Sequence, residues 1–64
     1  MELHHLVNRV RSEFDEMPGL RLTVAQAMRL WNLEAATCQR VIDVLIGSAF
    51  LRWGSAGTVV RCDG

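Results

Sequence analysis

The chain holds few side chains that could act as nucleophiles, bases or metal ligands, and their spacing does not group them. The candidates are Cys38, Cys62 and the adjacent histidines His4 and His5. The sequence contains no C-x-x-C pair and no H-x-x-x-H pair, which are spacings that bring two metal ligands together. Neighbouring histidines point to different sides of a helix, so we expect both at or near the surface. We therefore predict no metal site and no cofactor.

The other polar residues do not form a catalytic arrangement. No nucleophile stands at a recognisable spacing from a base, and no glycine-rich phosphate loop precedes an expected helix. Met28, Trp31 and Cys38 belong to helical apolar stripes, so we assign them to the core rather than to a cofactor site. We predict that the chain is not an enzyme, and no small-molecule substrate is evident.

Length and composition predict one small domain over residues 1–64. Half of the 64 residues are hydrophobic, which is enough to form a modest core. No apolar run approaches the roughly 18 residues of a membrane span. The first residues also lack the unbroken apolar centre of a signal peptide. We expect a cytoplasmic protein with no membrane partner.

The charge argues against a strong nucleic-acid binder, which usually carries a basic surplus. The formal net charge is zero, and the basic residues are seven arginines with no lysine. Residues 1–19 carry two arginines and four acidic residues, whereas residues 20–64 carry five arginines and three acidic residues. The second part of the chain is therefore the basic part.

The first part of the chain predicts a helix, a short strand and a second helix. Apolar residues at helical spacing predict a helix over residues 2–16, which Pro18 and Gly19 end. Alternating apolar residues over 20–22 favour a brief strand. Thr23, followed three residues later by Gln26, is a capping box that begins a helix over residues 24–31.

The second part predicts another helix and a hairpin. Asn32 tolerates the left-handed conformation that closes a tight turn, and a helix over residues 34–48 follows. Its inner face is expected to contain Ala35, Cys38, Val41, Ile42, Leu45 and Ala49. Its outer face is expected to contain Ala36, Thr37, Gln39, Arg40, Asp43, Val44 and Gly47. Two β-prone runs around a glycine-rich loop predict a hairpin over residues 50–61.

This order of elements resembles the winged helix-turn-helix fold, an α+β fold that is mainly α. Ala27-Met28 and Trp31-Asn32-Leu33 match its patterns in the first helix and the turn. Cys38, Val41 and Leu45 match the apolar positions of its second helix. The hairpin would be the wing.

The segment EFDEMPGLRLTVAQAMRLWNL is also similar to a group of small, uncharacterised bacterial winged-helix proteins. Two positions depart from the family pattern. Ala49 stands where a glycine usually follows the recognition helix, so a positive φ there would carry a cost. Glu34 stands where serine, threonine or aspartate usually caps that helix.

The resemblance implies a DNA-binding protein, a transcriptional regulator that reads the major groove of double-stranded DNA with helix 34–48. Gln39 could pair with adenine and Arg40 with guanine, because each presents two groups in one plane. The residues expected to face DNA bases are Ala36, Thr37, Gln39 and Arg40. Those expected to hold phosphates are Arg29, Arg52 and Ser55. So few basic residues would bind weakly alone, which favours a homodimer through the first helix or Trp53.

The alternative is a winged-helix module for protein–protein interaction or dimerisation that does not bind DNA. The near-neutral charge of the chain and the mild outer face of helix 34–48 fit this alternative. Two residues have two interpretations each. Arg40 is either a base reader or a solvated partner of Asp43. Trp53 is either an exposed interface anchor or a side chain packed on the sheet.

Overall fold

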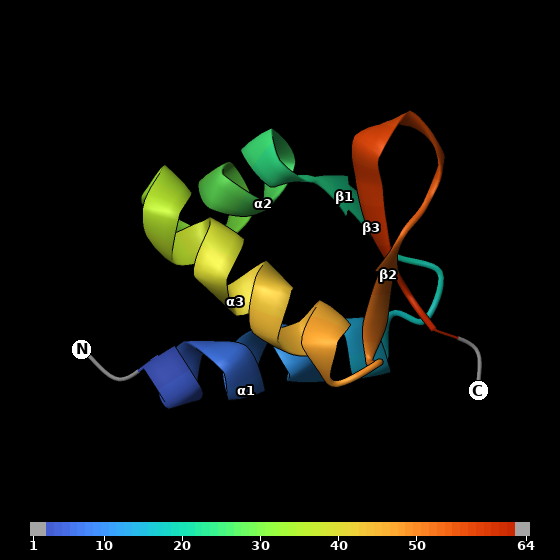
Figure 1. The fold of residues 1–64 in the computed structure, drawn as a ribbon, viewed down its shortest axis with the longest axis horizontal. Coiled ribbons are helices and arrows are strands. Elements are labelled where there is room, and N and C mark those ends of the chain that lie inside the picture. The colour runs from blue at the N-terminus through green and yellow to red at the C-terminus, as the bar shows by residue number, and fades with distance from the viewer. Residues whose placement is uncertain (1–2, 63–64) are drawn as a thin grey trace.

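The computed structural model describes residues 3–62, which form three helices and one three-stranded antiparallel sheet (Figure 1). The expected α+β fold with mainly helical content is confirmed. The elements are α1 (Leu3–Glu16), β1 (Arg21–Thr23), α2 (Val24–Trp31), α3 (Ala35–Gly47), β2 (Leu51–Trp53), a 3₁₀ turn (Ser55–Gly57) and β3 (Thr58–Arg61).

The observed boundaries differ slightly from the expected ones. The first strand begins at Arg21 rather than Leu20, and α3 occupies residues 35–47 rather than 34–48. The expected start of the first helix, Glu2, lies outside the described residues. The second helix has the expected limits, residues 24–31.

The start of α2 shows the expected capping box. The Gln26 backbone N–H donates to Thr23 Oγ1 at 3.1 Å, and the Thr23 backbone N–H donates to Gln26 Oε1 at 2.9 Å. At the other end Asn32 takes the left-handed conformation with φ 54°. The Leu33 N–H donates to the Met28 carbonyl at 2.9 Å. Local hydrogen bonds thus satisfy backbone groups at both ends of α2. The bonds at its second end fix the position at which the chain turns toward α3.

The end of α3 is a Schellman motif built on an alanine. The Phe50 N–H donates to the Leu45 carbonyl at 3.0 Å, and the Ala49 N–H donates to the Ile46 carbonyl at 3.0 Å. In this motif the residue after the cap is left-handed and is usually glycine. Ala49 occupies that position with φ 62°. The positive φ that would make an alanine costly at this position is therefore present.

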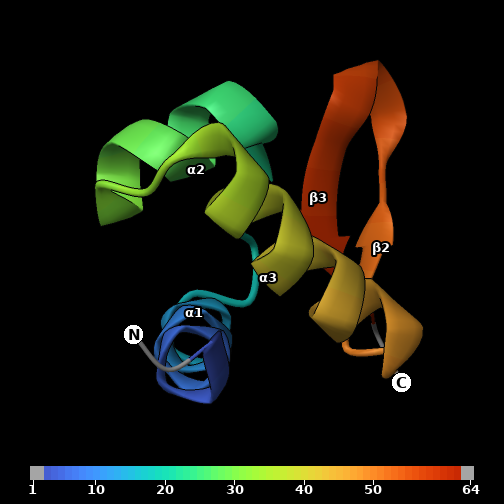
Figure 2. The same cartoon turned by 60° about the vertical axis from the view of Figure 1, so that its left-hand side comes forward.

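Helix α3 lies at the centre of the fold and packs against α1, α2 and β2. Figure 2 shows α3 between α1 and α2, with the β2–β3 hairpin beside it. The buried apolar side chains come from all three α-helices and from the two hairpin strands. They are Val10, Phe14, Ala27, Trp31, Cys38, Val41, Ile42, Leu45, Leu51 and Val59.

Two residues assigned to the inner face of the third helix are exposed, so that prediction is wrong for Ala35 and Ala49. Ala35 is the first residue of α3 and lies at its uncovered start. Ala49 follows the helix in the left-handed conformation, so its side chain no longer obeys the 3.6-residue period. On the expected outer face, Thr37 and Gln39 are half-buried rather than exposed.

The sheet has the strand order β1-β3-β2, so β3 is central. Arg21 pairs with Val60, and Val60 pairs with Arg52 on the other side. Because side chains alternate along a strand, these three residues share one face. Leu51 and Val59 point to the opposite face and are buried in the core. We call the face with Arg21, Val60 and Arg52 the outer sheet face.

Candidate functional site

The first candidate surface is the solvent-facing side of α3, which the turn after α2 holds in place. The turn is short because Asn32 reverses the chain within one residue of the end of α2. At the start of α3 the Glu34 side chain makes no capping hydrogen bond. The first backbone N–H groups of the helix therefore have no side-chain acceptor from the cap residue. Ala36 is exposed here and adds a small apolar side chain.

Arg40 and Gln39 have different surroundings on α3. The Gln39 side-chain amide donates to Asp43 Oδ1 at 2.9 Å. Arg40 is exposed, and within residues 3–62 the structure shows a single ion pair, from Arg61 Nη2 to Asp15 Oδ1 at 3.5 Å. Asp43 is therefore the partner of Gln39 rather than of Arg40. The Gln39 amide is thus already hydrogen-bonded. The Arg40 guanidinium has no ion-pair partner within residues 3–62.

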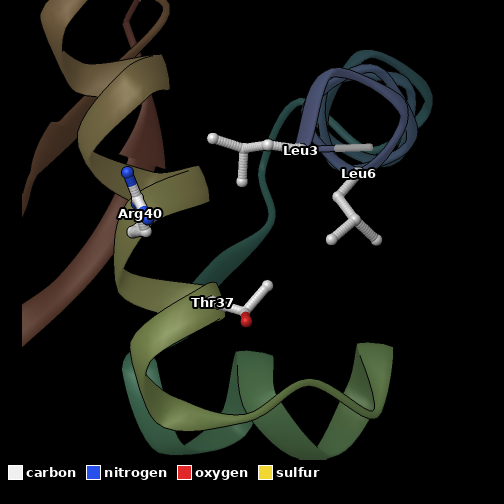
Figure 3. A pocket seen from close by; sticks show the side chains of 4 residues that line it. All are labelled: Leu3, Leu6, Thr37 and Arg40. Atoms are coloured by element: carbon white, nitrogen blue, oxygen red, sulfur yellow. The ribbon is translucent and has the colours of Figure 1, made fainter. Parts of the chain in front are cut away.

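A hollow of about 260 Å³ lies between α1 and the first half of α3 (Figure 3). Leu3 and Leu6 line it from α1. Thr37 and Arg40 line it from α3. Thr37 is thus turned toward α1, which explains why this expected DNA-facing residue is half-buried. The hollow combines an apolar wall with one hydroxyl and one cation.

The tip of the hairpin is a tight turn without charged side chains. Ala56 and Gly57 both have positive φ, 60° and 70°. The Thr58 hydroxyl donates to the Ser55 carbonyl at 2.9 Å. The Gly54 N–H donates to the Thr58 carbonyl at 2.7 Å and closes the loop. These bonds make the tip a defined turn on which Ser55 is exposed.

The expected phosphate-binding residues do not gather in one place. Arg52 and Ser55 line one hollow together with Arg21 on the outer sheet face. The hollow beside α3 contains none of these three residues. Arg29 lies in the last turn of α2 and is exposed, where its charge complements the helix dipole. The candidate residues therefore divide between α3 and the outer sheet face, with Arg29 separate.

Trp53 is 45% exposed, which agrees with the exposed interpretation rather than with full packing on the sheet. It pairs with Val59 in the register of β2 and β3 and shares its face. Val59 lies on the central strand of the sheet and is buried, whereas Trp53 lies on an edge strand and stays partly exposed. Val44 on α3 is also 45% exposed.

The cysteines and histidines do not form a reactive cluster. Burial raises the pKa of the Cys38 thiol, so the thiol stays protonated and weakly nucleophilic at neutral pH. Its sulfur lies 3.9 Å from the Val24 carbonyl oxygen. His4 and His5 are both exposed, as expected. Residues 3–62 contain no group of three side chains placed to hold a metal ion.

The Trp31 indole nitrogen is the one buried side-chain N–H or oxygen within residues 3–62 that has no hydrogen-bond partner. Trp31 is 4% exposed and packs at a ring-centroid distance of 6.2 Å from Phe14. None of the described hollows is lined by it. We therefore assign Trp31 to the core.

Sequence reasoning missed Arg21. The alternation of Leu20, Arg21 and Leu22 signals that the arginine points away from the core. The identity of the neighbouring strand, which brings Arg21 beside Val60 and Arg52, has no local signal. The pairing of Arg21 with Val60 joins residues that are 39 positions apart in the chain (60 − 21).

Comparisons of the chain with models of protein families, with curated proteins and with solved structures find no match. Among the helices that the structure describes, none is long and apolar enough to cross a membrane.

Proposed function

We propose that this chain is a winged helix-turn-helix domain that binds double-stranded DNA, as a small regulator of transcription. In this proposal α2 and α3 form the helix-turn-helix unit and the β2–β3 hairpin is the wing. The observation that carries the proposal is Arg40, an exposed arginine on α3 without an ion-pair partner in residues 3–62. The second helix of such a unit enters the major groove with its early residues toward the bases.

Arg40 supplies base recognition in this arrangement. A guanidinium can donate two parallel hydrogen bonds to O6 and N7 of guanine. Ala36, one turn earlier on α3, allows close approach and can contact a thymine methyl group. Gln39 reads a base only when its bond to Asp43 is broken, so it contributes less. Arg29 is assigned to a backbone phosphate.

The electrostatics favour weak binding by a single copy. Glu34, the residue before α3, and Asp43 on α3 are both exposed, and their negative charges repel phosphate. The hairpin tip has no charge to offset them. Two copies on two half-sites would multiply the affinity through effective concentration. We therefore propose that the chain acts as a homodimer on DNA.

The test is an amide-shift NMR titration with short mixed-sequence duplexes at low salt, where phosphate contacts are strongest. Shifts are expected in residues 35–44 and in the hairpin, and they should fade as salt is added. Arg40→Gln should weaken binding by about tenfold, because one bidentate base contact is lost. Arg9→Gln is the matched control, since Arg9 is an exposed arginine on α1. It removes the same charge from a site outside the proposed interface.

Two results would contradict the proposal. One is an absence of α3 shifts at low salt. The other is equal DNA affinity of Arg40→Gln and Arg9→Gln. That result would mean that Arg40 affects binding only through its contribution to the net charge.

A second candidate function is protein–protein interaction, which the exposure of Trp53 favours. Tryptophan is enriched at the centres of interfaces, and Trp53 and Val44 are each 45% exposed. The same NMR samples test this candidate without DNA. Shifts at Trp53 that depend on protein concentration, together with a dimer in sedimentation, would indicate self-association through the hairpin. If the chain sediments as a monomer at high concentration and its spectra do not change, the proposal of a homodimer is wrong.

A further inference from the structure

Two arginines stand on the same face of the sheet, one on each outer strand. Arg21 in β1 and Arg52 in β2 both pair with Val60 of the central strand. The two backbones are therefore about 10 Å apart, two strand spacings. Both side chains are exposed, and within residues 3–62 neither forms an ion pair. An anion lying between the two side chains would be attracted by both charges.

Both arginines line two adjacent hollows, one on each side of Val60. The hollow toward the hairpin tip has a volume of about 130 Å³ and adds Gly54, Ser55 and Thr58. The hollow toward the 18–20 loop has a volume of about 200 Å³ and adds Arg61. Both are smaller than the roughly 300–1,000 Å³ of drug-sized ligand sites. Their size suits a small anionic group rather than a larger organic ligand.

The charge lining these hollows is of one sign. No aspartate or glutamate lines either hollow. Asp15 pairs with Arg61 at 3.5 Å from the side of α1, so the charge of Arg61 is partly offset. Arg21 and Arg52 keep their full charge. Ser55 adds a hydroxyl that can donate to an anion.

The glycine at position 54 keeps the hollow toward the tip open. A Cβ at this position would lie 3.3 Å from Thr58 Oγ1 and 3.4 Å from Val60 Cγ1. It would thus occupy space between the hydroxyl and the apolar floor. The absence of a side chain leaves this space accessible between the arginines.

We propose that the outer sheet face binds a phosphate group through Arg21 and Arg52, at a site separate from the outer side of α3. A guanidinium donates in a planar fork that matches phosphate or carboxylate oxygens. One carboxylate has two oxygens and is occupied by a single fork. A tetrahedral phosphate has further oxygens and accepts both arginines at once, together with the Ser55 hydroxyl.

The phosphate group can come from a DNA backbone or from a free phosphate or small phosphate ester. Only the DNA source rests on the proposed function. In that case the sheet would add a phosphate contact beside the contacts of α3. The face points away from the core that α3 covers, because Leu51 and Val59 point toward that core.

The first experiment is an amide-shift titration of the whole chain with sodium phosphate, with sodium chloride at equal ionic strength as reference. Saturable shifts specific to phosphate are expected at Arg21, at Arg52 and in residues 54–60. Arg21→Gln and Arg52→Gln should each weaken phosphate binding by about tenfold, since each removes a charge-assisted fork. Arg9→Gln, with one exposed arginine removed elsewhere, should leave it within about twofold.

The second experiment identifies the source by adding a short duplex to the wild-type chain and to Arg40→Gln. Shifts on the outer sheet face in both proteins would assign the phosphate to a DNA backbone. Shifts with inorganic phosphate but not with the duplex would assign it to a free phosphate or a phosphate ester.

The site would be overturned by sheet shifts that chloride reproduces, or by phosphate binding that Arg21→Gln and Arg52→Gln leave unchanged. Failure of the proposed function looks different, because it removes duplex shifts on α3 and leaves the phosphate titration intact. All four substituted arginines are exposed, so the variants are expected to fold. Their unperturbed core amide shifts verify this in the same spectra.

Discussion

Ala49 holds a backbone conformation that suits glycine better than alanine. Its φ is 62° at the end of α3, and the left-handed region costs a residue with a Cβ about 1–2 kcal/mol. A glycine avoids this cost. It also gives the unfolded chain more conformational freedom, which lowers the free energy of unfolding by about 0.4–1 kcal/mol. We therefore expect Ala49→Gly to raise the free energy of unfolding by about 0.5–1 kcal/mol. Urea unfolding followed by circular dichroism measures the change.

The matched control is Ala25→Gly, which places glycine at an exposed position inside α2. This variant should lose about 0.5–1 kcal/mol, since helical φ gives glycine no advantage. Equal losses in both variants would contradict the argument for Ala49.

Because the Cys38 thiol is buried, we predict that the free energy of unfolding depends on pH in the alkaline range. Burial raises the pKa of its thiol in the folded chain. Below the pKa of the unfolded thiol both states are protonated, and the free energy of unfolding is unaffected. As the pH rises above about 8.5 the unfolded thiol ionises first, so the free energy of unfolding falls. The chain has no lysine or tyrosine, which leaves few other groups to titrate there.

Urea unfolding at pH 7, 9 and 10 measures this decline. Cys38→Ala removes the buried thiol and should flatten the decline, whatever its effect at pH 7. A decline of the same steepness in both proteins would assign the effect to another group.

At the scale of the elements, the capping box decides where α2 begins. Thr23→Ala removes the acceptor for the Gln26 N–H and should lower the free energy of unfolding by about 1 kcal/mol. Thr23→Ser keeps the hydroxyl oxygen and should cost much less. Thermal unfolding of the three proteins provides the comparison. If serine and alanine at position 23 destabilise equally, the capping bond is not the cause.

Which elements could be predicted depends on how local their determinants are. The box of Thr23 and Gln26 lies within four residues, and so α2 was predicted with the observed limits. A three-residue strand is defined by its partner, and the first strand was accordingly placed one residue early. The partner of Arg21 lies in β3, far along the chain, and no local pattern could place Arg21 beside Arg52.

Side-chain directions near helix ends were the least predictable part of the candidate site. Thr37 was assigned to the solvent side of its helix and instead lines the hollow facing α1. The helical period gives the direction of a side chain from its own axis, whereas α1 packs at an angle that only the tertiary structure sets. The sequence also left open whether Asp43 would pair with Arg40. In the structure Asp43 accepts a hydrogen bond from Gln39 instead.

At the scale of the whole molecule, one small core carries the stability. A core of this size supplies about 3–5 kcal/mol of net stability, and Phe14 is completely buried within it. Phe14→Ala should cost about 3–5 kcal/mol, which equals the net stability, so a large fraction of the molecules should be unfolded at room temperature. Far-ultraviolet circular dichroism measures the lost helix. Phe14→Leu keeps most of the volume and should remain folded, and a cooperative, native-like Phe14→Ala would contradict this dependence on one core.

The two tryptophans occupy opposite environments, and the chain has no tyrosine, so its near-ultraviolet emission comes from these two indoles. Trp31 is shielded beside Phe14 and should emit at shorter wavelength, out of reach of iodide. Trp53 meets water near the hairpin tip and should emit at longer wavelength and be quenched by iodide. The molecule thus contains two optical reporters, one for the integrity of the core and one for whatever covers the hairpin.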